Sequence, residues 1–175
     1  MEAAHAAGKP FRVGLWTGAS TAPELDGALA KAEGISMRLP YQSDPTVRNQ
    51  INAGGMFYSD MHLSHVAPMA WAGFFGRLNV AVIEVAGILP DGRLIPTTSV
   101  GNNKTWLDIA DHVILEVNHW QSTGLEGMHD IYYPIGALPP SRVPLPITAP
   151  GDRIGGKTML VDPEKVVAVI ATDAA

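Results

Sequence analysis

The chain has 175 residues, of which 46% are hydrophobic, no cysteine and a formal net charge of −5. This length suits a single domain that removes roughly 70% of its unfolded surface from water, so we expect a folded protein rather than a disordered one. The absence of cysteine excludes a disulfide framework, a thiolate zinc site and a cysteine nucleophile, and the acidic charge with no run of Lys or Arg argues against nucleic acid or a membrane surface as a partner.

The beginning of the chain predicts no targeting segment. Residues 1–14 lack a basic region followed by an apolar core, so they do not resemble a signal peptide, and no apolar run in the chain is long enough to span a membrane. The Ala-rich residues before Gly8 predict a helix that begins on the first residue without a cap. This pattern hints that the chain starts partway through a larger fold.

Helices and strands are expected to alternate along the first third of the chain. Thr21 and Glu24 match a capping box, so we expect a helix over residues 22–32 that Gly34 ends. Asp44 is placed to cap the next helix. The other elements predicted here are strands at 11–16, 35–39 and 56–61 and a helix from Pro45 to near Gly54.

The rest of the chain continues the alternation. Ser64 is expected to cap a helix at 65–73, and the apolar run VAVIEV at 80–85 predicts a strand that is covered on both faces of its sheet. Residues 134–163 are rich in Pro and Gly and form either an irregular ordered arm or a linker. The other predicted elements are a helix at 104–110 and strands at 93–97, 112–118 and 165–171.

This order of elements favours the α/β fold class. Strands that alternate with helices indicate an open, mostly parallel sheet with flanking helices and right-handed crossovers. We expect residues 1–175 to form a single domain, complete or truncated.

The first candidate site is TGAST at 17–21, between a strand and the start of a helix. In open α/β sheets ligands bind at the carboxyl ends of the strands, and a helix start offers free N–H groups to an anion. Ser20 and Thr21 could add hydroxyl donors to a carboxylate or a phosphate, although the same residues would also make an ordinary capped turn. Ser43 is a second candidate, beside Asp44, which a helix cap alone explains. The dinucleotide fingerprint and the P-loop pattern are both missing.

The segment DMHLSHV offers a possible metal site. Asp60, His62 and His65 have the chemistry of metal ligands. They do not match the HExxH pattern, and they fall where a strand changes to a loop. We therefore favour polar residues that line the end of the sheet over a metal centre.

Two acids lie inside apolar strands. A carboxyl group at Glu84 or Glu116 must be paired, protonated or placed at a strand end. The pattern alone would allow a catalytic role for Glu84, but we favour a structural role at the strand end.

Two later motifs also allow functional and structural interpretations. In TTSVGN, at 97–102, Gly101 either lets the backbone approach a ligand closely or only supplies a positive φ. In GMHD, His129 and Asp130 could form an oriented acid/base pair, but no nucleophile is near them in the sequence and we favour a structural role. No G-x-S-x-G elbow supports a serine hydrolase.

Seven segments carry a family resemblance. They are TGASTAPELDGALAKA, YQSDPTVRNQIN, YSDMHLSHV, the EV run around Glu84, IPTTSVGNN, LEGMHDIY, and GDRIGG followed by VDPEKVVAVIATD. In this order they resemble the acetyl-CoA hydrolase/transferase family, which holds succinyl-CoA:acetate and 4-hydroxybutyrate CoA-transferases and acetyl-CoA hydrolases. The resemblance covers essentially all 175 residues. It implies part of the N-terminal half of such an enzyme, with an α/β domain of the CoA-transferase type that is duplicated within one polypeptide.

The resemblance also implies ping-pong chemistry. A glutamate attacks acyl-CoA, forms an acyl anhydride and then a glutamyl-CoA thioester, and a second carboxylate completes the exchange. That glutamate and most CoA contacts belong to the carboxy-terminal half, so we expect no catalytic residue in this chain. Ser20 and Ser43 correspond to positions that line the carboxylate end of the active site, with Asp44, His62 and Asn102 as plausible neighbours.

The implied partners are acyl-CoA, a small carboxylate and the C-terminal half of the same enzyme, in a homodimer of the cytoplasm or the mitochondrial matrix. CoA is a substrate, and no cofactor or metal is implied. Three alternatives stay open: an acetyl-CoA hydrolase, a non-catalytic subunit of a two-chain transferase, and a metal-dependent hydrolase that uses Asp60, His62 and His65. Without the partner half we expect exposed apolar surface and self-association.

Overall fold

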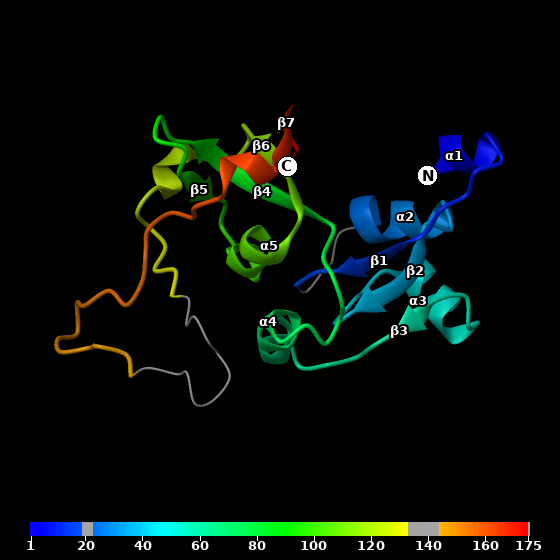
Figure 1. The fold of residues 1–175 in the computed structure, drawn as a ribbon, viewed down its shortest axis with the longest axis horizontal. Coiled ribbons are helices and arrows are strands. Elements are labelled where there is room, and N and C mark those ends of the chain that lie inside the picture. Colours follow the sequence, from blue (N-terminus) through cyan, green and yellow to red (C-terminus); the bar gives the residue numbers. More distant parts are fainter. Residues whose placement is uncertain (19–22, 133–143, 175) are drawn as a thin grey trace. The chain divides into compact units, whose positions relative to one another are not determined.

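The computed structural model describes residues 1–18, 23–132 and 144–174 (Figure 1). The chain divides into two compact units, Met1–Val66 (unit 1) and Ala67–Ala175 (unit 2). Both units have mixed α/β structure with mostly parallel strands, so the predicted fold class is confirmed. A single domain over the whole chain stays a prediction.

Unit 1 is built on a three-stranded parallel sheet. Its strands are β1 (Val13–Trp16), β2 (Ile35–Leu39) and β3 (Phe57–Tyr58), in the order β1-β2-β3. Its helices are α1 (Glu2–Ala6), a π-helical segment (Pro23–Gly27) that continues into α2 (Ala28–Lys31), and α3 (Pro45–Asn52). The core of unit 1 consists of Ala30, Ile35, Val47 and Met56, with Leu15, Leu29 and Ile51 packed against it.

The start of α3 is the best predicted feature of unit 1. Asp44 accepts hydrogen bonds from the backbone N–H groups of Thr46 and Val47, at 2.8 and 3.0 Å. Pro45 fills the first helical position, where its missing N–H costs nothing. Strand β2 also has its predicted bounds. The predicted cap at Thr21 lies outside the described residues.

The end of α2 differs from the prediction by one residue. The residue with a left-handed backbone is Glu33, with φ of 49°, and not Gly34. The N–H groups of Glu33 and Gly34 bond the carbonyl groups of Ala30 and Leu29, both at 2.9 Å, in the pattern of a Schellman motif. Gly34 therefore occupies the position after the left-handed residue.

Helix α4 (Leu63–Trp71) spans the boundary between the units. It begins before Ser64, so the predicted cap at Ser64 is wrong. The Ser64 hydroxyl instead lies 2.8 Å from Nδ1 of His62. The local pattern did not distinguish a cap from a hydroxyl in the first turn. The strand predicted before this helix is shorter than expected and contains only Phe57–Tyr58.

Unit 2 contains a four-stranded sheet in the order β5-β4-β6-β7. Strands β4 (Val80–Ile88), β6 (His112–Asn118) and β7 (Val166–Thr172) are parallel, and β5 (Leu94–Pro96) is antiparallel to β4. Helix α5 (Asn103–Ile109) joins β5 to β6 (Figure 1). Two single 3-10 turns, Thr123–Leu125 and Pro163–Lys165, complete the unit.

The two faces of this sheet are unequal. Side chains that alternate along β4 and β6 are buried on one face, among them Ile83, Val85 and Leu115. On the other face Val82 is 60% exposed and Ile170 is 45% exposed. The prediction that VAVIEV is covered on both faces is therefore wrong. An apolar run is compatible with burial on both faces of a strand, but it does not show that a layer of structure covers the second face.

The described part of the predicted Pro- and Gly-rich arm, from residue 144 on, contacts the rest of unit 2 through backbone and side-chain hydrogen bonds. Met159 exchanges two backbone hydrogen bonds with Leu94, at 2.9 and 3.0 Å, and Gly156 exchanges two with Ile131, at 2.7 and 3.0 Å. Arg153 donates to the carbonyl oxygens of Gly127 and His129, at 2.8 and 2.7 Å. The earlier residues of this arm, up to 143, lie outside the described residues.

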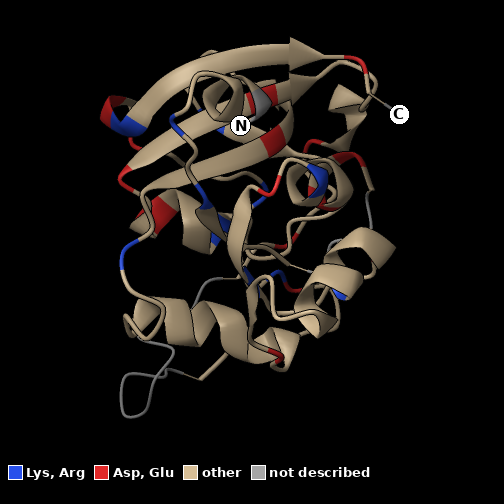
Figure 2. Cartoon of the chain, turned by 90° about the vertical axis from the view of Figure 1, so that its right-hand side faces the viewer, with Lys and Arg blue, Asp and Glu red and all other residues tan. Residues whose placement is uncertain are grey.

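Charged side chains are scattered along the elements (Figure 2). The 17 acidic and 12 basic residues are interspersed in the sequence, so the net charge of −5 does not come from an acidic tail. No helix in the described ranges is long and apolar enough to cross a membrane.

Candidate functional site

The carboxyl ends of β1, β2 and β3 meet at one edge of the unit 1 sheet. The pairing continues past the strands, because Thr17 N–H bonds the Leu39 carbonyl at 3.2 Å and Ser59 N–H bonds the Arg38 carbonyl at 3.1 Å. The TGAST segment, of which Thr17 and Gly18 are described, the loop 40–44 and the DMHLSHV segment therefore all begin at this edge. Open parallel sheets bind ligands at this place.

Only one of the two predicted substrate-binding serines lies among the described residues. Ser20 lies outside the described residues. Ser43 lies in the loop after β2 and is half-buried. Its carbonyl oxygen accepts a hydrogen bond from Arg48 at 3.1 Å, which ties the loop to α3. Asp44 is 8% exposed, and its Oδ1 atom is occupied by the helix cap described above. The Asp44 carboxylate is thus engaged by the helix cap. The Ser43 hydroxyl is therefore the better placed of the two side chains to meet a ligand.

A buried ion pair lies beneath this edge. Arg38 is 0% exposed and Asp26 is 1% exposed, and Nη2 and Nε of Arg38 lie 2.9 and 3.3 Å from Oδ2 of Asp26. Arg38 also donates from Nη1 to the carbonyl oxygen of Leu39. This pair was not predicted from the sequence. The pattern ISMRL carries no signal for it, because side chains alternate along a strand and Arg38 therefore shares a face with Ser36, which is exposed.

Tyr58 ends β3 at the same edge. Its phenol has a pKa above the ordinary value, mainly because it is partly buried and secondly because the Asp60 carboxylate is close. The positive charge of Arg38 opposes this shift. At neutral pH the phenol is therefore protonated.

The residues of the metal alternative do not form a ligand cluster. Asp60, His62 and His65 are all exposed, and the two imidazole rings lie 5.6 Å apart at an angle of 43°. Within the part of the chain that the structure describes, no group of three His, Asp or Glu side chains is arranged to hold a metal ion. The geometry therefore gives the metal-dependent hydrolase no support.

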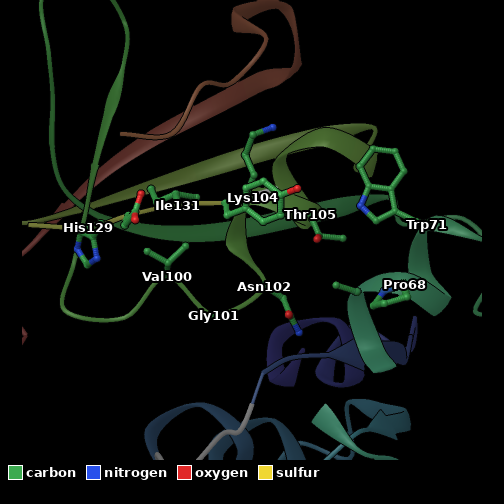
Figure 3. Close-up of a pocket in the computed structure, with 12 residues that line it drawn as sticks. Pro68, Trp71, Val100, Gly101, Asn102, Lys104, Thr105, His129 and Ile131 are labelled. Carbon is green, nitrogen blue, oxygen red and sulfur yellow. The ribbon is translucent and has the colours of Figure 1, made fainter. Parts of the chain in front are cut away.

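Unit 2 holds a cavity of about 380 Å³ between the end of α4, the TTSVGN loop, α5 and residues 129–132 (Figure 3). Its size lies in the range of small-molecule pockets. Its walls are mostly apolar, with a few amide, hydroxyl and imidazole groups among them. The main side chains that line it are Pro68, Trp71, Val100, Asn102, Thr105 and His129. The sequence analysis singled out Asn102 and His129 but did not bring them together.

Two buried nitrogen atoms lie at this cavity without a hydrogen-bond partner in the described ranges. They are Nδ2 of Asn102 and Nε2 of His129. Asp130 is not available to orient His129, because its two carboxylate oxygens accept the N–H groups of Ile154 and Gly155, at 3.1 and 2.7 Å. These bonds support the structural interpretation of the GMHD motif.

Glu84 and Glu116 are neighbours on the open face of the unit 2 sheet. They stand opposite each other in the parallel register of β4 and β6. Glu84 accepts a hydrogen bond from Asn118 at 2.7 Å, and Glu116 accepts one from Thr172 at 2.9 Å. Each carboxylate is thus satisfied by a neighbouring strand. These bonds support a structural role, but Glu84 is the middle residue of β4 (Val80–Ile88), so its predicted place at a strand end is wrong.

Comparisons with known proteins agree with the motif series. The family model described as the acetyl-CoA hydrolase/transferase N-terminal domain matches residues 2–171. The chain is 43% identical over 169 residues to the propanoyl-CoA:succinate CoA transferase of Escherichia coli, covering 97% of this chain and 34% of the relative. It is 42% identical over 163 residues to the succinyl-CoA:acetate CoA-transferase of Clostridium kluyveri, covering 93% and 30%.

Acetyl-CoA hydrolases are also among the relatives. The Saccharomyces cerevisiae enzyme is 35% identical over 167 residues, covering 91% of this chain and 31% of the relative. The chain thus spans about a third of the length of these curated relatives.

A solved structure supports the fold. The 4-hydroxybutyrate CoA-transferase of Porphyromonas gingivalis matches 99% of this chain and 39% of its own, with a TM-score of 0.51 and 18% identity. The resemblance found in the motifs is therefore confirmed, and the chain belongs to the acetyl-CoA hydrolase/transferase family, in the region of its N-terminal domain.

Proposed function

We propose that this chain forms the carboxylate-facing wall of an acyl-CoA:carboxylate CoA-transferase. The observation that carries the proposal is the carboxyl edge of the unit 1 sheet, where the TGAST turn and the Ser43 loop follow adjacent parallel strands. The substrates are taken from the relatives at 43% and 42% identity, which are named for CoA transfer between short acyl groups. The substrate class is therefore acyl-CoA and small carboxylates such as acetate or succinate.

The reaction proceeds in two halves through a glutamate that is supplied by the region of the relatives beyond the matched segment. Its carboxylate attacks the acyl-CoA carbonyl and breaks the C–S bond, which gives an anhydride and the CoA thiolate. The thiolate then attacks the glutamyl carbonyl, releases the first carboxylate and leaves a glutamyl-CoA thioester. The acceptor carboxylate repeats these steps in reverse, which forms the new acyl-CoA and regenerates the glutamate.

Ser20 and Ser43 supply hydroxyl donors to the oxygens of the bound carboxylate or acyl group. A carboxylate that has left water must recover its hydrogen bonds, because an unpaired buried charge is costly. The Ser43 hydroxyl is suited to this role, since it is half-buried at the edge and no described residue accepts or donates a hydrogen bond to it. Asp44 and His62 remain candidate neighbours of the substrate in unit 1. Asn102 lines the cavity of unit 2 and is a candidate only through the family resemblance.

The proposed enzyme uses CoA as a substrate and needs no further cofactor or metal. This chain works together with the C-terminal half of the same enzyme, in a homodimer of the cytoplasm, with the mitochondrial matrix as the alternative location. A non-catalytic subunit that pairs with a separately encoded half would use the same surfaces. Co-expression that recovers a stoichiometric second chain would favour that arrangement.

An acetyl-CoA hydrolase is the second candidate. The observation that favours it is the identity of 35% to 36% with yeast proteins of that name. In this reaction water, rather than a carboxylate, takes the acyl or glutamyl group. The edge of the unit 1 sheet would serve both reactions, so only product analysis separates them.

The test is a chimaera of the Escherichia coli relative in which this chain replaces the 169 aligned residues. We expect the chimaera to exchange CoA between propanoyl-CoA and succinate, and we expect the 175-residue chain alone to be inactive. Exchange by the chain alone would overturn the division of labour proposed above. Release of free CoA without succinyl-CoA would favour the hydrolase.

A Ser43→Ala variant of the chimaera tests the binding role. Loss of one hydrogen bond worth about 1 kcal/mol should lower kcat/KM for succinate by roughly five- to tenfold. Ser36→Ala, at an exposed position in the first half of β2, is the matched control and should leave kcat/KM unchanged. Equal values for the two variants would remove Ser43 from the site.

A further inference from the structure

We propose that the buried Arg38–Asp26 pair consists of positioning residues that hold the Ser43 loop in place for the carboxylate substrate. The proposal rests on the proposed function. Neither residue reaches the edge of the sheet, because both are almost fully buried, at 0% and 1% exposure. Their influence on a substrate must therefore pass through the backbone that they anchor.

The first anchor is at the beginning of the Ser43 loop. Arg38 is the fourth of the five residues of β2, and its Nη1 atom donates to the carbonyl oxygen of Leu39, the last residue of the strand. The loop 40–44 starts at the next peptide bond. The guanidinium group is itself held by Asp26 through two contacts, from Nη2 at 2.9 Å and from Nε at 3.3 Å. The direction in which the chain leaves β2 is thus tied to Asp26.

The second anchor is at the end of the same loop. Asp26 and Gly27 belong to the π-helical segment that follows the TGAST turn. A Cβ atom on Gly27 would lie only 2.7 Å from Oδ2 of Asp44, so this segment and the end of the Ser43 loop are in close contact. Asp44 is in turn held by the N–H groups of Thr46 and Val47. One segment therefore contacts the loop at Asp44 and anchors its beginning through Arg38.

Stability alone is a poor reason for such a pair. Taking two charges out of water is expensive, and replacing a buried ion pair by apolar side chains of similar volume is often neutral or stabilising. The pair here is also incompletely satisfied, since Oδ1 of Asp26 is buried without a partner in the described ranges. An arrangement with this cost is better explained by the geometry that it imposes on the loop.

The experiment uses the chimaera and a double variant, Arg38→Met with Asp26→Val, which removes both charges together. We expect it to fold, because no unpaired buried charge remains. In ping-pong kinetics each kcat/KM reports one half-reaction. We expect kcat/KM for succinate to fall about ten- to hundredfold, since small misplacement of binding groups has effects of this order. The value for propanoyl-CoA should fall by a comparable factor, because the Ser43 loop also contacts the acyl group in that half-reaction.

The matched control is Arg77→Met with Asp111→Val, which removes an exposed ion pair of 2.7 Å in unit 2 and should leave both values unchanged. Unchanged values in the Arg38/Asp26 double variant would overturn the positioning role, and so would a fall that is not accompanied by faster amide exchange of residues 41–43. If the unsubstituted chimaera has no exchange activity, the proposed function fails, and the positioning role is then decided on the 175-residue chain by hydrogen exchange.

In that measurement the amides of residues 41–43 should exchange at least several-fold faster in the double variant, with the amides of α5 unchanged. Equal exchange of residues 41–43 in the two proteins would overturn the proposal whatever the outcome with the chimaera.

Discussion

The two units use their parallel sheets in opposite ways. In unit 1 the polar residues collect at the carboxyl edge, and the loops at that edge are interlocked through Arg38, Asp26 and Asp44. In unit 2 the unusual surface is a face rather than an edge, because Val82 and Ile170 remain exposed on one side of β4, β6 and β7. Parallel sheets are almost always covered on both faces. The proposed function places the substrate at the edge of unit 1, whereas the open face of unit 2 leaves apolar side chains exposed.

The largest effect on stability is expected when one member of the buried Arg38–Asp26 pair of unit 1 is replaced and the other is kept. Arg38→Met alone leaves Asp26 buried without its cation, which should lower the free energy of unfolding by about 3–5 kcal/mol. Urea unfolding followed by tryptophan fluorescence measures this. Arg77→Met, at a side chain that is 77% exposed, should change the free energy by less than about 1 kcal/mol. Similar losses in the two variants would contradict the central place of Arg38 in unit 1.

The unequal faces of unit 2 can be tested with two neighbouring residues of β4. Ile83 is 1% exposed, and Ile83→Ala should lower the free energy of unfolding by about 2–5 kcal/mol. Val82 points to the open face, and Val82→Ala should change it by only about 0.5 kcal/mol. Val82→Lys should also reduce the self-association of the chain, which light scattering detects. A dilute, monomeric chain with no affinity for an apolar dye would contradict the open face.

Features that depend on residues close together in the sequence were predicted correctly, and features that depend on residues far apart in the sequence were not. Strand β2 and the start of α3 were predicted correctly because Gly34, Pro40, Asp44 and Pro45 mark them locally. The partners Arg38 and Asp26 are twelve residues apart and meet only when the helix packs on the sheet, so a local pattern could not pair them. The same reason explains the cavity of unit 2, whose lining comes from three distant segments.

The candidate site was predictable to the extent that it follows from strand order. The position of Ser43 at the carboxyl edge follows from a parallel sheet in which a loop succeeds each strand. The open face of β4 was not predictable, because the run VAVIEV has the same composition whether one or two layers cover it. The contact between Gly27 and Asp44 was not predicted, because the helix cap alone already explained the presence of Asp44.

A smaller change tests the contact between the π-helical segment Pro23–Gly27 and the end of the Ser43 loop. Gly27 has an ordinary helical backbone, with φ of −66°, so alanine there should gain about 0.5–1 kcal/mol of helix propensity. The added Cβ would lie 2.7 Å from Oδ2 of Asp44, whose carboxylate is held by the cap, and overpacking of this kind costs about 1–3 kcal/mol. We therefore expect a net loss of about 1 kcal/mol for Gly27→Ala. A stabilised variant in thermal unfolding would show that Asp44 moves freely.

The smallest effect is expected from the titration of Tyr58 at the edge of unit 1. Its pKa is raised above 10.0, first by burial and then by Asp60, so the unfolded chain loses the phenol proton at a lower pH than the folded chain. The contribution of the protonated phenol to stability is therefore complete below pH 10.0 and is lost as the pH rises through the raised value. Tyr58→Phe should remove this alkaline loss, while Tyr132→Phe, in unit 2, should keep it. Tyrosinate absorbance during alkaline titration, with unfolding measured in parallel, tests both. If Tyr58→Phe loses stability above about pH 10 as steeply as the unsubstituted chain, the Tyr58 phenol is exposed to solvent. The contacts that hold the edge of unit 1 then do not extend to β3.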